Sequence, residues 1–71
     1  MTAQTISLTL NGKPRSLPGE TPLLDLLAEL GVDRRLIAVA HNGDIVPRDT
    51  YERVVLRDGD SVEVVRMVGG G

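Results

Sequence analysis

The residues with the clearest chemistry are the last three, Gly69, Gly70 and Gly71. Three successive glycines leave the backbone free, so they predict a flexible tail able to thread a narrow channel in another protein. The terminal carboxylate of Gly71 is unhindered, but a free α-carboxylate has a pKa of about 3.5 and is an unreactive anion at neutral pH. It must be activated before it can react, and adenylylation with ATP is the usual route. The same residues also fit a frayed terminus or an appended segment, so composition alone leaves their role open.

Other residues of reactive type are better explained by structure. His41 is the only histidine, and no nucleophile is evident for it to serve, so we expect a partly buried strand residue. Asp58-Gly59-Asp60 superficially resembles a calcium loop, but an EF-hand requires Glu at its twelfth position, which here is Gly69. We therefore expect a turn. With no cysteine and one histidine, neither a disulfide nor a zinc site is expected.

The size and composition of the chain favour one small domain without a catalytic pocket. A cleft of roughly 300 Å³ would take up much of the core of a small domain, and this chain has only 71 residues. We therefore expect the chain to be bound by larger enzymes rather than to act as an enzyme itself. The net charge of −2 and the single aromatic residue argue against nucleic acid as a partner. Because no signal peptide or apolar stretch of about 20 residues is evident, we expect a cytoplasmic protein that does not contact a membrane.

The apolar periodicity predicts an α+β domain with one helix. Apolar and polar residues alternate over 6–10, as in a half-buried strand, and the following Asn-Gly dipeptide predicts a hairpin. Pro14 in the returning strand indicates a sheet edge. Thr21 is expected to be the N-cap of a helix that begins at Pro22, and Gly31 is expected to end it. The predicted elements are strands at 6–10, 13–17, 36–41, 54–56 and 61–68, a helix at 22–30 and one helical turn at 47–52.

The last predicted strand presents a candidate docking surface. Its alternation turns Val65 and Met67 away from the helix, beside the glycines. Ala40 on the neighbouring strand is expected to join them, and Val68 leads into the tail. One helix leaves the other face of the sheet uncovered, and an apolar cluster there is typical of a partner-binding surface. An adaptable Met suits a protein that must fit several enzymes.

Four motifs are distinctive when taken together: Asn42-Gly43-Asp44-Ile45-Val46-Pro47-Arg48, Tyr51, Asp58-Gly59-Asp60 and the terminal Val68-Gly69-Gly70-Gly71. On these residues, and over its full length, the sequence resembles the sulfur-carrier proteins of thiamine biosynthesis, the ThiS family. The resemblance implies a ubiquitin-like β-grasp domain over residues 1–68, with a mixed sheet of four to five strands packed on one helix, and a flexible glycine tail over 69–71.

The resemblance also implies a reaction sequence and partners. An adenylyltransferase of the ThiF type would use ATP and Mg²⁺ to adenylylate Gly71, and a persulfide donor would convert the adenylate to a thiocarboxylate. Thiazole synthase, the ThiG type, would receive the sulfur. No cofactor is expected to be bound to the chain itself.

Three other functions stay open on sequence alone. The small subunit of molybdopterin synthase shares the fold and the terminus, but it usually carries Phe and Pro before the glycines, where this chain has Arg66, Met67 and Val68. A ubiquitin-like tag joined to lysines through the same tail is a second candidate. A non-covalent β-grasp interaction module, in which the glycines do nothing, is the third.

Overall fold

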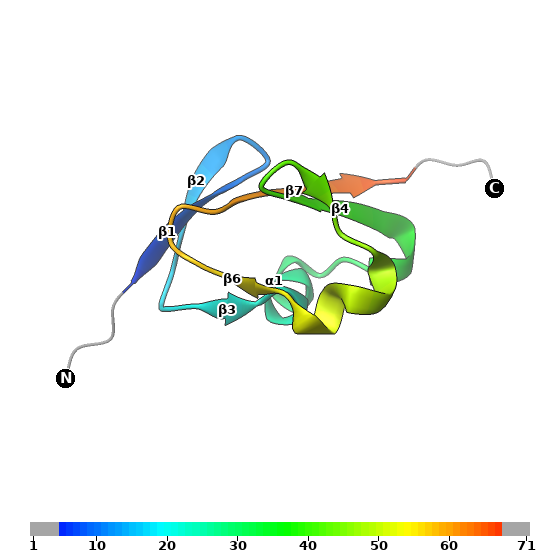
Figure 1. Ribbon diagram of the computed structural model, residues 1–71, viewed down its shortest axis with the longest axis horizontal. Helices are drawn as coiled ribbons and strands as arrows, with labels where there is room; N and C mark the ends of the chain where they lie inside the picture. The colour runs from blue at the N-terminus through cyan, green and yellow to red at the C-terminus, as the bar shows by residue number, and fades with distance from the viewer. Residues whose placement is uncertain (1–4, 68–71) are drawn as a thin grey trace.

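The structure has two layers, a five-stranded sheet and a layer of helices and short strands packed beneath it (Figure 1). The computed structural model describes residues 5–67. Within this range the elements are β1 Ile6–Leu10, β2 Lys13–Leu17, β3 Thr21–Pro22, α1 Leu23–Leu30, the 3₁₀ helix η1 Arg34–Leu36, β4 Ile37–His41, β5 Asp44–Ile45, the 3₁₀ helix η2 Arg48–Arg53, β6 Val55–Leu56 and β7 Ser61–Arg66.

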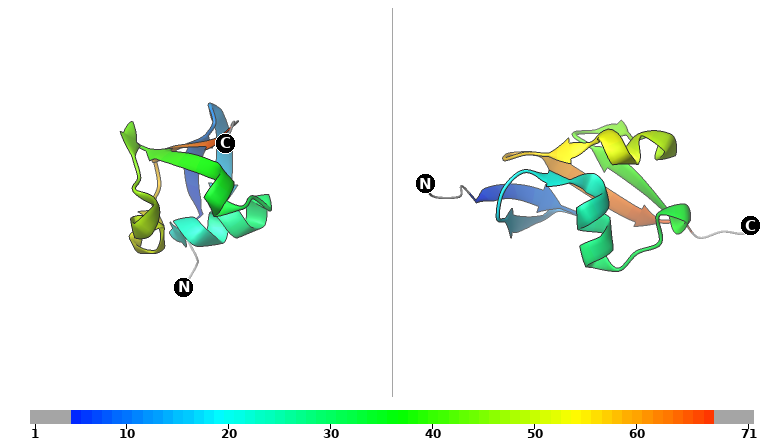
Figure 2. Two further views of the ribbon diagram at one scale, coloured as in Figure 1. Left: turned by 90° about the vertical axis from the view of Figure 1, so that its right-hand side faces the viewer. Right: turned by 90° about the horizontal axis from the view of Figure 1, so that it is seen from below.

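The main sheet is mixed and has β7 at its centre. Its strand order is β2-β1-β7-β4-β5, with β7 parallel to β1 and antiparallel to β4. The predicted α+β class, a mixed sheet packed on one helix, is confirmed, and β2 lies at an edge as Pro14 indicated. The short strand predicted near residue 55 pairs instead with β3 in a separate two-stranded sheet, on the helix side of the molecule (Figure 2).

The two Asn-Gly turns hold β7 from both sides. Asn11 and Asn42 each have a φ of 51°, which a type I′ turn requires and Asn tolerates better than most residues. The Asn11 Oδ1 accepts a hydrogen bond from the Val64 N–H at 2.8 Å, and the Asn42 Oδ1 accepts one from the Ser61 N–H at 2.8 Å. The Asn11 amide also donates to the Val64 carbonyl at 3.3 Å. Both side chains therefore accept hydrogen bonds from β7 as the backbone of a neighbouring strand would.

Helix α1 supplies the apolar face that the sheet covers. Of its periodic leucines, Leu23, Leu26 and Leu27 are buried and Leu30 is half-buried. The helix ends as predicted at Gly31, which adopts the left-handed conformation with φ 71°. Tyr51, the only aromatic residue, is 2% exposed and anchors η2 in the same core. Among residues 5–67 the buried apolar residues are Ile6, Leu8, Leu17, Leu23, Leu26, Leu27, Ile37, Val39, Val46, Tyr51, Leu56 and Val62.

The predicted start of the helix is wrong by one residue. Thr21 is not the N-cap, because it pairs with Leu56 in the two-stranded sheet and its hydroxyl donates to the Gly19 carbonyl at 2.8 Å. The first helical residue is Leu23, whose N–H donates to the Val54 carbonyl at 2.9 Å. A neighbouring segment thus satisfies the helix N-terminus in place of a side-chain cap.

Two predicted strand boundaries are also wrong. Leu36 ends η1, so β4 begins at Ile37. The last strand ends at Arg66, because Arg66 lies opposite Ile37, the first residue of its partner strand. The prediction that the strand continues to Val68 falls partly outside the described residues, as do the glycines at 69–71.

Candidate functional site

Strand β7 carries the chain from the middle of the sheet toward the glycines. One residue past its end, the Met67 N–H donates a hydrogen bond to the Leu36 carbonyl at 2.9 Å. This bond ties the base of the tail to η1, at the end of the molecule where β4 begins (Figure 1). The predicted tail residues lie outside the described part of the chain: Val68, Gly69, Gly70 and Gly71.

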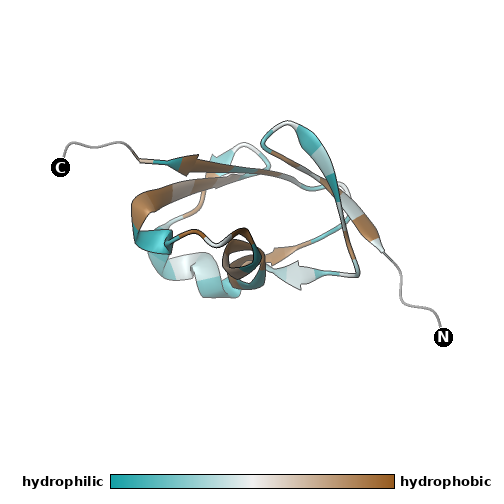
Figure 3. Ribbon diagram, turned by 180° about the vertical axis from the view of Figure 1, so that it is seen from behind, coloured by the Kyte–Doolittle hydropathy of each residue, from teal (hydrophilic) through white to brown (hydrophobic). Residues whose placement is uncertain are grey.

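An apolar surface lies on the open face of the sheet, next to the base of the tail. The buried residues of β4 alternate with Ala38 and Ala40, which face outward. Ala38 is opposite Val65 of β7, and Ala40 is opposite Ile45 of β5. Val65 and Ile45 are 58% and 72% exposed. Figure 3 shows the apolar character of β4 and of the C-terminal part of β7. We define the outer apolar surface as Leu36, Ala38, Ala40, Ile45, Val65 and Met67.

The sequence predicts the outward position of Val65, Met67 and Ala40, and the structure places these three on one face, where the exposed Glu63 lies opposite Ala40. It also adds two large residues that sequence reasoning missed, Leu36 and Ile45. The period of two along β4 extends back to Leu36, and the register set by the second Asn-Gly turn places Ile45 beside Ala40. Both signals were present in the sequence. A role in partner binding stays a prediction for all of these residues.

His41 belongs to a hydrogen-bonded cluster at the start of β7. Its Nε2 lies 2.7 Å from the Asp60 Oδ2, and Asp60 also accepts bonds from the Arg57 N–H at 2.9 Å and the Asn42 amide at 3.3 Å. Burial alone raises the pKa of Asp60, but the bonds from His41, Arg57 and Asn42 outweigh it and hold the pKa below its ordinary value. The cluster joins two turns beside β7, so we assign His41 a structural role.

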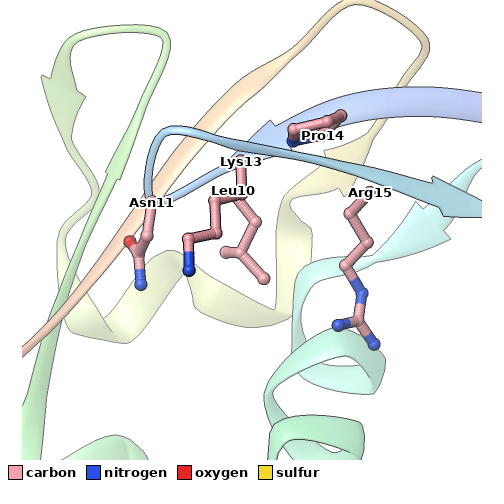
Figure 4. A pocket seen from close by; sticks show the side chains of 5 residues that line it. All are labelled: Leu10, Asn11, Lys13, Pro14 and Arg15. Carbon is pink, nitrogen blue, oxygen red and sulfur yellow. The ribbon is translucent and has the colours of Figure 1, made fainter.

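A shallow hollow under the β1–β2 hairpin contains no evident catalytic arrangement. Arg15 crosses toward α1, where it forms an ion pair with Glu29, and the Asn11 side chain is hydrogen-bonded to β7. Figure 4 shows the lining residues, which are Leu10, Asn11, Lys13, Pro14 and Arg15. Over residues 5–67, no group of three or more His, Asp or Glu side chains is placed to hold a metal. No helix in that range is long and apolar enough to cross a membrane.

A mixed five-stranded sheet, one packed helix and an open apolar face at the end of the central strand define a ubiquitin-like β-grasp protein. The particular family follows from sequence comparison. Residues 8–71 match the ThiS family model, and the chain belongs to this family. The resemblance read from the sequence is thus confirmed.

Individual relatives differ in how much of their length this chain covers. The sulfur carrier protein ThiS of Thermus thermophilus is 44% identical over 62 residues, which are 87% of this chain and 95% of that protein. A thiazole synthase of Paramagnetospirillum magneticum is 42% identical over 66 residues, 93% of this chain but 20% of that protein. The chain therefore spans about a fifth of the length of the first curated relatives that it matches. The solved structure of the thiamine biosynthesis protein ThiS of Geobacter metallireducens matches with a TM-score of 0.81 and 33% identity, covering 93% of this chain and 100% of that one.

Proposed function

We propose that this chain is a sulfur carrier of thiamine biosynthesis that holds sulfur on the carboxylate of Gly71. The observation that carries the proposal is the match to the ThiS family, which extends over the glycines to residue 71. The placement of β7 supports it, because the central strand of the sheet leads directly to this tail. Four residues follow Met67, and four extended residues span at most about 14 Å. That length can bring a terminal carboxylate into an active site while the domain stays outside.

The proposed chemistry has three steps. The Gly71 carboxylate attacks the α-phosphate of ATP, held with Mg²⁺ by an adenylyltransferase of the ThiF type, and pyrophosphate leaves. The terminal sulfur of a protein persulfide then attacks the acyl carbon, and AMP leaves. A thiol cleaves the resulting S–S bond, which gives a disulfide and the free thiocarboxylate. The chain supplies the acyl group and its position, and the enzymes supply the catalysis.

The proposed recipient of the sulfur is a thiazole synthase of the ThiG type. A stretch similar to this chain occurs within two relatives named thiazole synthase, which supports a working association between the two kinds of domain. The outer apolar surface is the proposed docking site, because large apolar side chains there are exposed beside the base of the tail. The same surface would serve the adenylyltransferase, so the partners would bind in turn.

An intact-mass measurement tests the carrier proposal. The chain is incubated with the adenylyltransferase, ATP, Mg²⁺ and a persulfide donor, and the expected product is heavier by the exchange of one oxygen for sulfur. Deletion of Gly71 is the matched control. It moves the carboxylate by about 3.3–3.6 Å, and a misplacement of 1 Å can already cost about a hundredfold in rate. Equal conversion of the full and the shortened chain would contradict the proposal.

A second experiment separates the thiamine pathway from that of the molybdenum cofactor, because both carriers end as thiocarboxylates. The purified thiocarboxylate is mixed either with thiazole synthase and its other substrates or with the large subunit of molybdopterin synthase and its precursor. Thiazole formation in the first mixture and no dithiolene in the second are expected. The converse result would overturn the thiamine assignment and leave the role of Gly71 standing.

A further inference from the structure

Basic side chains gather at the end of the molecule from which the tail leaves. Arg66 is the last residue of β7 and lies opposite Ile37, and the Arg48 guanidinium lies 3.5 Å from the Ile37 carbonyl. Arg34 begins η1, whose last residue accepts the hydrogen bond from Met67. Figure 2 shows η1, η2 and the end of β7 together at this end. A chain with a net charge of −2 thus has half of its eight Lys and Arg residues here: Arg34, Arg35, Arg48 and Arg66.

Three of these arginines form no ion pair among the described residues, although the charge of Arg34 contributes to the lowered pKa of the neighbouring Asp33. Arg35 is held by Asp33, with Nη2–Oδ2 at 3.0 Å and Nε–Oδ1 at 3.2 Å, and these bonds lower the pKa of Asp33 to about 2. Arg34, Arg48 and Arg66 have no carboxylate oxygen within 4.0 Å in the part of the chain that the structure describes. All three are exposed. We call these three residues the basic cluster.

The surroundings of the basic cluster leave room for a partner group. Arg34 and Arg48 line one hollow between η1 and η2, together with Arg35, Asp49 and Glu52. Neither carboxylate of η2 reaches a guanidinium of the basic cluster. A guanidinium presents a planar fork of donors that suits a carboxylate. The two arginines therefore offer donors that an incoming acidic side chain can use.

The basic cluster also adjoins the outer apolar surface. Leu36, a member of that surface, is in the same turn of helix as Arg34. One partner can cover both, with apolar groups on the sheet face and acidic groups at the tail exit. Such a division is common in interfaces, where an apolar centre provides most of the affinity and charges at the rim set the association rate.

We propose that the basic cluster guides the chain onto an acidic segment, bearing Asp or Glu side chains, beside the channel of the adenylyltransferase that receives the tail. This inference rests on the proposed function, since that function requires an enzyme to accept the tail. The attraction acts before the tail enters, orients the carrier, and falls as salt screens it over a Debye length of about 10 Å at 0.1 M.

The test is the association rate constant of the carrier with the adenylyltransferase at low and high salt. Arg34→Glu/Arg48→Glu is expected to associate about tenfold more slowly at low ionic strength, and the difference should vanish at high salt. Arg34→Glu alone serves as a second variant, because Arg48 contacts the Ile37 carbonyl. Arg57→Glu is the control matched in charge to Arg34→Glu: the side chain is 68% exposed and its nearest carboxylate, on Glu20, is 3.8 Å away.

Each outcome supports or overturns the guiding role of the basic cluster. A salt-dependent loss confined to the Arg34 and Arg48 variants, with an unchanged KM for ATP, supports an acidic protein segment as the occupant. Equal losses in Arg57→Glu would reduce the effect to net charge and overturn the proposal. A raised KM for ATP would mean that the arginines contact the nucleotide instead. If wild-type carrier is not adenylylated at all, the proposed function fails. If wild-type carrier is adenylylated and the arginine variants associate as fast as wild type, only the guiding role of the basic cluster is rejected.

Discussion

Val65→Asp is expected to separate partner binding from folding. Val65 is 58% exposed, lies opposite Ala38 and belongs to the outer apolar surface. In the free carrier the new carboxylate stays largely in water. In a docked complex it is buried against apolar groups without a partner, and such burial is costly. The matched control is Val55→Asp, the same substitution at an exposed valine in the short sheet on the other layer, which is 38% exposed.

The expected size of the effect follows from the exposed fraction. Removing two methyl groups costs about 1.6 kcal/mol for a fully buried site, and the 58% of Val65 that docking can cover reduces this to about 1 kcal/mol. An unpaired polar group adds about 1–3 kcal/mol. The sum, at least about 2 kcal/mol, corresponds to a Kd raised about 30-fold. In the free domain, strand propensity limits the loss to about 1 kcal/mol, or about 4–8 °C in Tm for a domain of this size.

The assay pairs calorimetric titration against the adenylyltransferase with thermal unfolding of each free variant. Val65→Asp should bind about 30-fold more weakly, and Val55→Asp should bind like wild type, while both lose a similar amount of thermal stability. Normal binding by Val65→Asp, or equal weakening by Val55→Asp, would refute the outer apolar surface as the docking site.

Three further outcomes are expected. Gly70→Val should lower the adenylylation rate by about a hundredfold because the β-branched side chain obstructs the channel, with Tm unchanged; a large fall in Tm would give the glycine a structural role. Asn11→Gly removes two hydrogen bonds to Val64 and should cost about 1–2 kcal/mol in urea unfolding, a result that an unchanged midpoint would contradict. Asp60 has a folded pKa below its ordinary 3.8, so its contribution to stability is present above pH 3.8 and is lost as pH falls through the folded pKa. Asp60→Asn should therefore destabilise at pH 7 and less at pH 3, and a loss of equal size at both values would exclude the charge as the cause.

Local signals in the sequence predict most of the fold. The features that these signals do not predict depend on contacts between residues far apart in the chain. The hairpin at Asn11 and the helix end at Gly31 follow from backbone preferences, which act over a few residues. The hydrogen bonds from Asn11 to Val64 join residues 53 apart, and no local pattern encodes them. Thr21 is the sharpest case, because its Thr-Pro sequence satisfies the rule for an N-cap while pairing with Leu56 decides its actual position.

The candidate site also combines residues that local signals predict with residues that long-range contacts place. Alternation along β7 is enough to predict that Val65 faces outward, and the three successive glycines are enough to predict a tail. Leu36 and Ile45 were missed although local signals exist for both, namely the period of two along β4 and the turn that sets Ile45 beside Ala40. Neither signal shows that β4 lies next to β7. The basic cluster was missed as well, since its residues are far apart in sequence. Arg34 and Arg48 line one hollow between η1 and η2, and the pairing of β4 with β7 brings Arg66 to the same end of the molecule.

The central position of β7 gives the tail a mechanical anchor. Under the proposed function, an enzyme that grips the terminal glycines would pull on a strand that is hydrogen-bonded to β1 on one side and β4 on the other. Bonds that run across a strand are loaded in shear by such a pull and must yield together, whereas an edge strand peeled from its end loses them one at a time. The Asn11 and Asn42 side chains add further bonds across the same strand. Under the proposed function, a pull on the tail would therefore load the bonds to both neighbouring strands together.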